Sequence, residues 1–202
     1  MYLTRLLLNT RHAQVRRDLG NPYDMHRTLV RAFVENKEQE SPHFLWRLEP
    51  QMAWSNPPVV LVQSEHQPNW GKIESAHFKT APETKTFAFE QLFCEGQCCR
   101  FRLLANPTVC RAGKRLGIVN ESEQLQWLTR QSQIHGFVVQ TAVVTASDMF
   151  KARKKEAFIC LQCVCYEGVL QITDIVRLQA ALVNGIGHGK AFGCGLLSLA
   201  RI

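Results

Sequence analysis

The sequence predicts an α+β protein made of two tandem ferredoxin-like domains. Its 202 residues are enough for one sizeable domain or for two small domains with separate cores. Strand-like and helix-like patterns recur in the same order in both halves, and each half reads roughly as βαβ-β with a further helix or strand. This is the split-βαβ order of ferredoxin-like folds. We place the boundary near residue 95, which gives an N-terminal domain over 1–95 and a C-terminal domain over 96–202.

In the first half, the best-supported element is a helix over 22–36. Asn21 is a good N-cap, and Pro22 suits the first helical turn. One buried stripe at helical spacing is formed by Met25, Leu29, Ala32 and Phe33. The other expected elements are a strand (2–9), a basic loop (Arg11, Arg16, Arg17), strands (43–49, 58–63, 86–94) and loops (50–58, 64–85).

The second half repeats this order. The expected elements are a strand (98–105), a basic loop (Arg111, Lys114, Arg115), a helix (121–132), strands (136–146, 157–167), a helix (172–183) and a last strand (195–201). The basic run Lys151-Ala-Arg-Lys-Lys155 falls between two strands, where we expect a hairpin tip. This run is either a solvated turn or an arm whose cations follow a phosphate backbone.

Composition indicates an ordinary globular protein with a basic balance. The net charge is +7 and the sequence pI is about 9.1, which fits either a polyanionic partner such as nucleic acid or simple solubility. No apolar stretch approaches the roughly 18–20 residues that span a bilayer. Segment 2–9 is interrupted by Arg5 and reads as a strand, not as a secretory leader. We therefore expect a cytoplasmic protein with no membrane partner.

The eight cysteines do not form a zinc-binding pattern. Cys160, Cys163 and Cys165 lie in one expected strand, where Cys160 points away from the other two. The adjacent Cys98 and Cys99 also face opposite ways. Because a zinc site needs converging ligands, we expect these residues to be small buried hydrophobes in a reducing compartment, and we expect no metal and no cofactor.

One face of the helix 22–36 carries groups that can move protons and hold a phosphate. Tyr23, His26 and Arg27 are neighbours at i, i+3 and i+4 near its start, and Arg31 follows one turn later. Histidine is the side chain whose unperturbed pKa lies near neutrality. A histidine at the edge of an amphipathic helix can equally be a structural residue, so this pattern alone leaves both interpretations open.

The segment Gly185–Gly195 contains five glycines in eleven residues before the closing strand. Glycines permit positive φ and a close approach of the backbone to a ligand, and successive N–H groups can bind an anion. The spacing fits neither a P-loop nor a dinucleotide fingerprint. A helix C-cap explains Gly185 but not the other glycines, so the segment Gly187-His-Gly-Lys190 is a candidate anion-binding site.

The four aspartates, Asp18, Asp24, Asp148 and Asp174, are scattered and do not suggest a two-metal nuclease. If the chain cuts RNA, the internal 2′-hydroxyl is then the natural nucleophile. Histidine would transfer protons, and basic residues would stabilise charge on phosphorus.

Three separated motifs cover essentially the whole chain in one order: Asn21-Pro-Tyr-Asp-Met-His-Arg-Thr-Leu29, Leu104-Ala-Asn-Pro-Thr108 with Gly113-Lys-Arg115, and Gly187-His-Gly-Lys-Ala-Phe-Gly-Cys-Gly-Leu-Leu-Ser198. Together they resemble the CasE family, the CRISPR RNA-processing endoribonucleases of the type I-E Cascade complex. The resemblance implies tandem ferredoxin-like (RRM-like) domains and metal-independent cleavage at the 3′ base of a repeat hairpin. It also implies a 2′,3′-cyclic phosphate product that stays bound inside Cascade with the other subunits.

By position, the resemblance implies that His26 is the catalytic histidine and Tyr23 the active-site tyrosine. It further implies RNA contacts by the glycine-rich loop and by the basic hairpin. The expected RNA-binding residues are Arg27, Arg31, Lys114, Arg115, Lys151, Arg153, Lys154, Lys155, Gly187, His188, Gly189 and Lys190. Two alternatives remain at this point: an RRM-like module that only binds RNA, although the RNP1 signature is absent, and a purely structural subunit of the ribonucleoprotein.

Overall fold

The computed structural model describes residues 1–202 except 37–38, 52, 54 and 155–156, and of 151–154 and 157–158 it describes only the backbone. The elements of the first half are β1 (Tyr2–Leu7), α1 (Ala13–Gly20), α2 (Pro22–Val30), β2 (Phe44–Leu48), β3 (Val59–Ser64), the 3-10 helices η1 (Trp70–Lys72) and η2 (Ser75–His77), β4 (Glu83–Thr86) and η3 (Phe89–Gln91). Those of the second half are β5 (Cys98–Ala105), β6 (Thr108–Arg111), β7 (Lys114–Gly117), α3 (Glu121–Ile134), β8 (Phe137–Lys154), β9 (Ala157–Ile172), α4 (Ile175–Asn184), η4 (Lys190–Phe192) and β10 (Leu197–Arg201).

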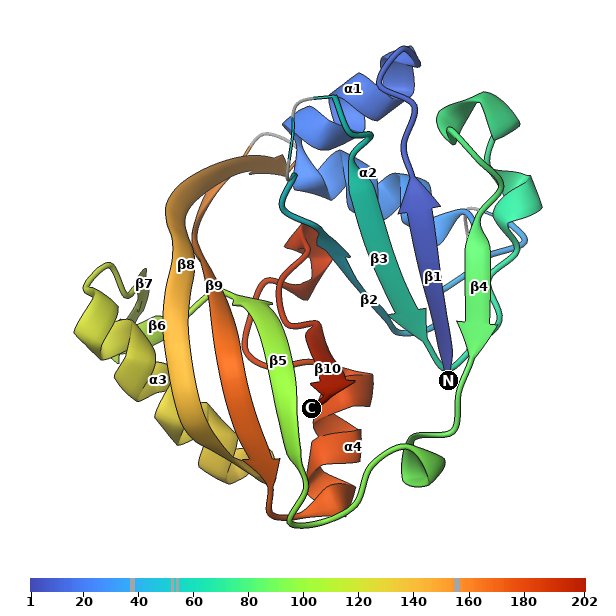
Figure 1. Ribbon diagram of the computed structural model, residues 1–202. Helices are drawn as coiled ribbons and strands as arrows, with labels where there is room; N and C mark the ends of the chain where they lie inside the picture. Colours follow the sequence, from blue (N-terminus) through green and yellow to red (C-terminus); the bar gives the residue numbers. More distant parts are fainter. Residues whose placement is uncertain (37–38, 52, 54, 155–156) are drawn as a thin grey trace.

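Two four-stranded antiparallel sheets confirm the predicted α+β class with tandem ferredoxin-like domains. Their orders are β2-β3-β1-β4 and β10-β5-β9-β8, so within each domain the strands lie in the ferredoxin-like order 4-1-3-2, read in one direction or the other. Each sheet has its own apolar core: one includes Leu6, Met25 and Phe44, and the other includes Phe101, Trp127 and Tyr166. The sheets stand beside each other, and the loop after α4 lies between them (Figure 1). Among the helices of the described residues, none is long and apolar enough to span a membrane.

The region around the first helices differs from the prediction. Arg16 and Arg17, expected in a loop, lie on α1, which packs Val15 into the N-terminal core. The helix expected over 22–36 ends at Val30, although its apolar stripe continues inward as far as the buried Ala32. The carbonyl oxygen of Ala32 accepts a hydrogen bond from the amide of Asn69 at 2.8 Å. A loop distant in the sequence thus satisfies a carbonyl group of the turn that follows the helix.

The last strand of the first half was predicted at the wrong position: it covers Glu83–Thr86 and not 86–94. The edge strand β4 ends at Thr86, where it pairs with Tyr2, and every side chain of β4 is exposed. The chain then turns, and Phe89 is buried in the core of the C-terminal domain. An exposed edge strand has no apolar alternation, so the sequence carried no signal for it.

The basic loops of the second half are regular hairpins. The segment around Arg111 forms β6 and β7, joined by a two-residue turn at Ala112 and Gly113, both with positive φ. Strands β8 and β9 are longer than expected, so Lys151, Arg153 and Lys154 belong to β8 and not to a turn. Because β9 continues to Ile172, α4 begins three residues later than predicted.

The prediction that the cysteines are buried is wrong for half of them. All eight cysteines are free, and Cys98 and Cys99 do face opposite ways, but Cys94, Cys98, Cys110 and Cys160 are exposed. Cys99, Cys165 and Cys194 are buried as expected.

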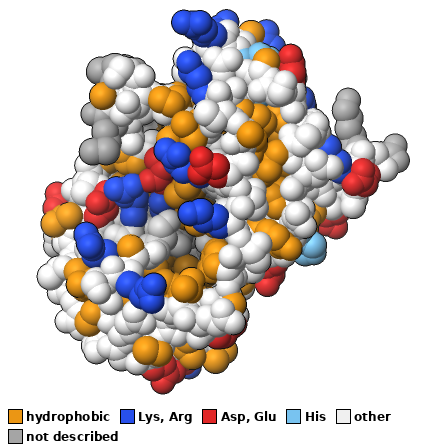
Figure 2. Space-filling view, turned by 45° about the vertical axis from the view of Figure 1, so that its right-hand side comes forward, with side chains coloured by type: hydrophobic (Ala, Val, Ile, Leu, Met, Phe, Trp, Pro, Cys, Tyr) orange, Lys and Arg blue, Asp and Glu red, His pale blue; other side chains and the backbone are white. Residues whose placement is uncertain are grey.

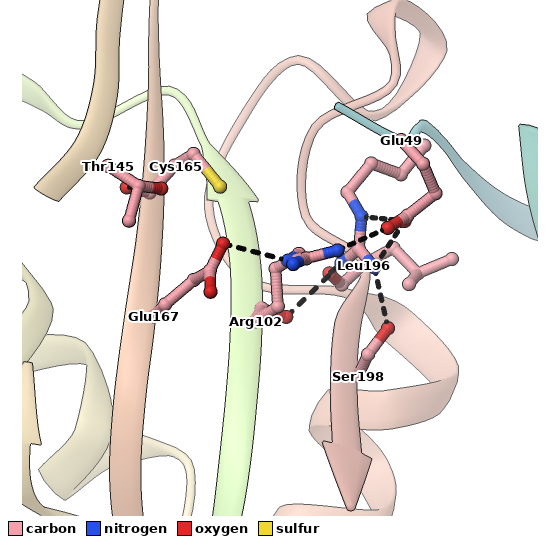
Figure 3. Close-up of polar contacts among 8 residues, drawn as sticks. Glu49, Arg102, Thr145, Cys165, Glu167, Leu196 and Ser198 are labelled. Carbon is pink, nitrogen blue, oxygen red and sulfur yellow. Dashed lines mark hydrogen bonds and ion pairs between the residues drawn. The ribbon is translucent and has the colours of Figure 1, made fainter. Parts of the chain in front are cut away.

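A buried polar network joins the two domains. Arg47 of β2 is only 2% exposed, and its Nη1 donates to the carbonyl oxygens of Arg102 (3.1 Å) and Leu196 (3.0 Å), while its Nη2 donates to Ser198 Oγ (2.9 Å). Glu49 accepts from Arg47 Nε at 2.6 Å and from Arg102 Nη1 at 2.5 Å. Arg102 in turn donates through Nε to Glu167 at 3.0 Å (Figure 3). We call Arg47, Glu49, Arg102 and Glu167 the interdomain network.

Among the described residues, the interdomain network is one of two buried polar contacts between the domains. Burial lowers the pKa of the Arg47 guanidinium, and Glu49 opposes this shift. Cationic and acidic side chains are interleaved around a hollow on the surface (Figure 2). A second buried contact is made by Gln63, whose Nε2 donates to the carbonyl oxygen of Leu182 at 2.6 Å.

Candidate active site and nucleic-acid interface

The helix α2 carries the predicted proton-transfer residues. Asn21 caps it by accepting a hydrogen bond from the Tyr23 amide at 3.3 Å, and Pro22 occupies its first turn, as predicted. Tyr23 and His26 are both half-buried and lie one turn apart. Arg27 is exposed, and Arg31 is the C-cap residue.

The ring of His26 is held by aromatic packing. It stacks on Phe44 of β2 with ring centroids 5.1 Å apart and an interplanar angle of 20°. Phe44 stacks in turn on Phe33, at 4.7 Å and 13°. The plane of the imidazole is therefore set by the N-terminal core. Phe44 was not singled out in the sequence, where it looks like any other apolar residue of a strand.

The helix α2 also contacts the glycine-rich loop of the other domain. The Tyr23 ring lies 6.1 Å from the ring of Phe192 in η4. The loop approaches closely because Gly193, at φ 85°, faces Trp46: a Cβ there would lie 3.1 Å from the indole. The sequence analysis missed Phe192, although its position as the one aromatic residue within a run of glycines was a usable signal.

A basic pocket of about 550 Å³ lies between α1 and α2. Its cations are Arg17, Arg27 and Arg31. Asp24 also lines the pocket and offsets part of their charge, since its Oδ1 lies 4.0 Å from Nη1 of Arg27. Arg27 and Arg31 were predicted, whereas Arg17 was placed in a loop and left out of the site. The residues of α2 that line the pocket include Asp24, Arg27 and Thr28, and neither Tyr23 nor His26 is among its lining residues.

The position of Arg17 depends on the buried residue beside it. Asp18 is 1% exposed, accepts a hydrogen bond from Gln14 Nε2 at 2.8 Å and lies 3.4 Å from Nε2 of His77. Burial lowers the pKa of His77 and so favours the neutral imidazole, although the charge of Asp18 opposes this shift. These contacts fix the rotation of α1 and therefore the direction of Arg17.

The glycine-rich loop has the backbone that its composition predicted. Gly185 is the C-cap of α4, and Gly187 and Gly189 have φ of 78° and 88°. Gly187 packs against Trp127, where a Cβ would lie 3.0 Å from the indole ring. His188 is exposed and forms a backbone bridge with Asn106.

Several predicted RNA contacts come together around His188. Its pKa is lowered by desolvation first, and then by the charges of Arg115 and Lys190, so these cations lie near the ring. The stem of Lys190 packs over the backbone of Gly185 and Gly195, and its charge also lowers the pKa of His135, after burial. Lys190 thus lies near Arg115 and His188, whereas Phe192 is the residue through which the loop contacts α2.

The basic hairpin reaches toward α2. Phe150 and Asp148 of β8 line a pocket of about 240 Å³ together with Pro22, Met25 and Phe192. The backbone of Lys151, Arg153 and Lys154 continues from there, but their side chains, and Lys155 altogether, lie outside the described part of the chain. Lys114 is exposed on β7. Within the described residues, no cluster of three or more His, Cys, Asp or Glu side chains is arranged to hold a metal ion.

Comparison with known proteins identifies a family and several relatives. Residues 1–201 match the family described as "CRISPR associated protein". The chain is 38% identical to "CRISPR-associated endoribonuclease Cse3" of Thermus thermophilus, covering 99% of this chain and all of that protein. It is 32% identical to "CRISPR system Cascade subunit CasE" of Escherichia coli over the full length of both.

A solved structure extends the similarity to three dimensions. The structure of Thermus thermophilus Cse3 bound to an RNA representing a pre-cleavage complex matches with a TM-score of 0.88 and 36% identity, covering 99% of this chain and 98% of that one. The resemblance inferred from the three motifs is confirmed. The chain belongs to the CasE/Cse3 family of CRISPR-associated proteins.

Proposed function

We propose that this protein is an endoribonuclease that binds a CRISPR repeat hairpin and cuts precursor CRISPR RNA by attack of a 2′-hydroxyl. The observation that carries this proposal is the full-length match to Cse3, which includes a solved pre-cleavage RNA complex. The 2′,3′-cyclic phosphate product stays bound, and the protein assembles with other Cascade subunits, as the name of the CasE relative indicates for that protein.

The chemistry needs only groups that α2 and its surroundings can supply. The 2′-oxygen forms a bond to the adjacent phosphorus, the bond from phosphorus to the 5′-oxygen breaks, and one fragment ends in a 2′,3′-cyclic phosphate. The other fragment carries a 5′-hydroxyl. One proton leaves the 2′-oxygen and one reaches the 5′-oxygen, and His26 performs one of these transfers. Tyr23, one turn away, orients or deprotonates the nucleophile.

The positively charged groups divide into two sets that support different parts of the RNA. Arg17, Arg27 and Arg31 hold phosphates of the RNA in the basic pocket beside α2. Arg115, His188 and Lys190, with the N–H groups of Gly187 and Gly189, hold the backbone at the second domain. Contacts by Lys114, Lys151, Arg153, Lys154 and Lys155 with the stem remain predictions from the sequence.

We propose a division of the chain near residue 95, so that domain 1–95 supplies proton transfer and domain 96–202 supplies most of the grip on RNA. We also propose a cytoplasmic location, since eight free cysteines fit a reducing compartment.

The test replaces one hydroxyl of the RNA, the 2′-hydroxyl beside the scissile phosphate, by hydrogen. This change removes the nucleophile and leaves every phosphate and base pair in place. We expect unchanged binding and no detectable cleavage, and we expect excess EDTA to leave the cutting rate of the unmodified RNA unchanged. Normal cleavage of the deoxy substrate would mean that water attacks, while binding without cleavage of either RNA would favour an RNA-binding or structural subunit.

A further inference from the structure

Two cysteines from distant parts of the chain lie side by side beneath the glycine-rich loop. The Sγ atoms of Cys163, on β9, and Cys194, in the loop, are 3.9 Å apart. A disulfide requires about 2.05 Å, so the sulfurs need to approach by about 2 Å. Both thiols are free in the structure.

The two thiols differ in access and in acidity. Cys194 is fully buried, whereas Cys163 is half-buried and lines the pocket of about 240 Å³ beside Phe150 and Phe192. A hydrogen bond with Cys194 lowers the pKa of Cys163, although burial and Asp148 oppose it. The same contact and burial raise the pKa of Cys194. Cys163 is therefore the thiol that a small oxidant can reach and that more readily becomes a thiolate.

The backbone on both sides of Cys194 consists of glycines with positive φ. Gly193 and Gly195 flank it with φ of 85° and 96°, and Gly189, whose carbonyl accepts from the Cys194 amide at 3.3 Å, has φ of 88°. Phe192, two residues from Cys194, lies against Tyr23 of α2 with ring centroids 6.1 Å apart, so we expect a shift of Cys194 to alter this contact.

We propose that Cys163 and Cys194 are a modification site at which a hydroperoxide forms an intrachain disulfide that pulls the glycine-rich loop toward β9 and slows RNA cleavage. The effect on cleavage rests on the proposed function, whereas formation of the disulfide does not. The Cys163 thiolate attacks the peroxide, giving a sulfenic acid and hydroxide. The Cys194 thiol then attacks that sulfur, so water leaves and the disulfide forms.

The experiment treats the reduced full-length protein with hydrogen peroxide and follows the disulfide and the cleavage rate separately. Trypsin should yield a linked pair of peptides, 156–177 with 191–201, that disappears after treatment with dithiothreitol. We expect repeat-RNA cleavage to fall about tenfold or more upon oxidation, because displacement of a positioning group by an ångström or so has effects of this size. Dithiothreitol should restore the rate.

Matched variants separate this pair from the other cysteines. Cys163→Ser and Cys163→Ala should abolish the linked peptide and the peroxide sensitivity, whereas Cys160→Ser, at an exposed position of the same strand, should retain both. The proposal is overturned if no linked peptide forms or if oxidised protein cuts as fast as reduced protein. It is also overturned if peroxide lowers the cleavage rate of the Cys163 variants as much as that of wild type. Failure of reduced wild type to cut repeat RNA would instead contradict the proposed function, and the peptide assay would still report on the disulfide.

Discussion

The two domains share one strand order but differ in the segments that connect their strands. In the N-terminal domain the connection from β1 to β2 contains α1 and α2, and the connection from β3 to β4 contains the short 3-10 helices η1 and η2. In the C-terminal domain the connection from β5 to β8 contains the β6–β7 hairpin and α3, and the connection from β9 to β10 contains α4 and the glycine-rich loop. The candidate proton-transfer residues lie in the β1–β2 connection of one domain, and the candidate anion-binding loop lies in the β9–β10 connection of the other.

This difference places the candidate catalytic residues and the candidate binding loop in different domains. The sheets supply rigid support, and the connections carry the candidate groups. We call α2 with Tyr23 and His26 the N-terminal half-site, and the glycine-rich loop the C-terminal half-site. They belong to different domains, and the interdomain network is one of the contacts that hold these domains together. Each half-site, and the network, can be altered separately by mutation.

The largest effect is expected from removing the chemistry of the N-terminal half-site. His26→Ala should lower the cleavage rate by about 10²–10⁴-fold, the usual contribution of a general acid or base. RNA affinity should persist, because the phosphate contacts lie elsewhere. Single-turnover cleavage and a binding titration measure the two quantities. His66→Ala, an exposed histidine of the same domain, is the matched control and should leave both unchanged. Near-normal cleavage by His26→Ala would place the catalytic group in another residue.

The next effect concerns the network between the half-sites. Arg47→Met removes a buried charge while keeping the aliphatic bulk, and it leaves two carbonyl oxygens and Ser198 without their donor. Loss of one partner from a buried charged network typically lowers the free energy of unfolding by about 3–5 kcal/mol, which urea denaturation can measure. Glu35→Gln, which breaks the exposed Lys72–Glu35 pair, should cost only about 0–1 kcal/mol. Equal, small losses in both variants would show that the domains are held by other contacts.

The smallest effect is expected from the basic pocket beside α2. The double variant Arg17→Ala/Arg27→Ala should weaken binding to all hairpins alike and flatten the slope of log K against log salt by about two units. Cleavage at saturating enzyme should change less than affinity. Arg177→Ala, which removes a cation paired with Asp174 on α4, is the control. A salt slope identical to that of wild type would exclude these arginines from contact with phosphate.

Local signals predicted the parts of the site that depend on short stretches of chain. The Asn21-Pro22 cap placed the start of α2 correctly, and Gly185 ends α4 with positive φ as expected. The family motifs directed attention to Tyr23, His26 and the glycine-rich loop, and the structure brings Tyr23 and Phe192 of that loop into contact. The catalytic and RNA-binding roles of the individual residues remain predictions that the variants above test.

The sequence by itself determined the fold class, the family and the helix that carries His26, because apolar periodicity, caps and motifs are properties of neighbouring residues. Only the tertiary structure decided the edge strand β4, the basic pocket with Arg17, the interdomain network and the Cys163–Cys194 pair. In β4 the backbone pairs with β1 while every side chain faces solvent, so no side-chain pattern marks it. Arg47 stands in the apolar strand Phe44–Leu48. Glu49 is near it in the chain, but its other hydrogen-bond acceptors, on Arg102, Leu196 and Ser198, lie 55 to 151 residues away. Contacts at such separations are fixed by how two cores pack, and a linear pattern does not encode that packing.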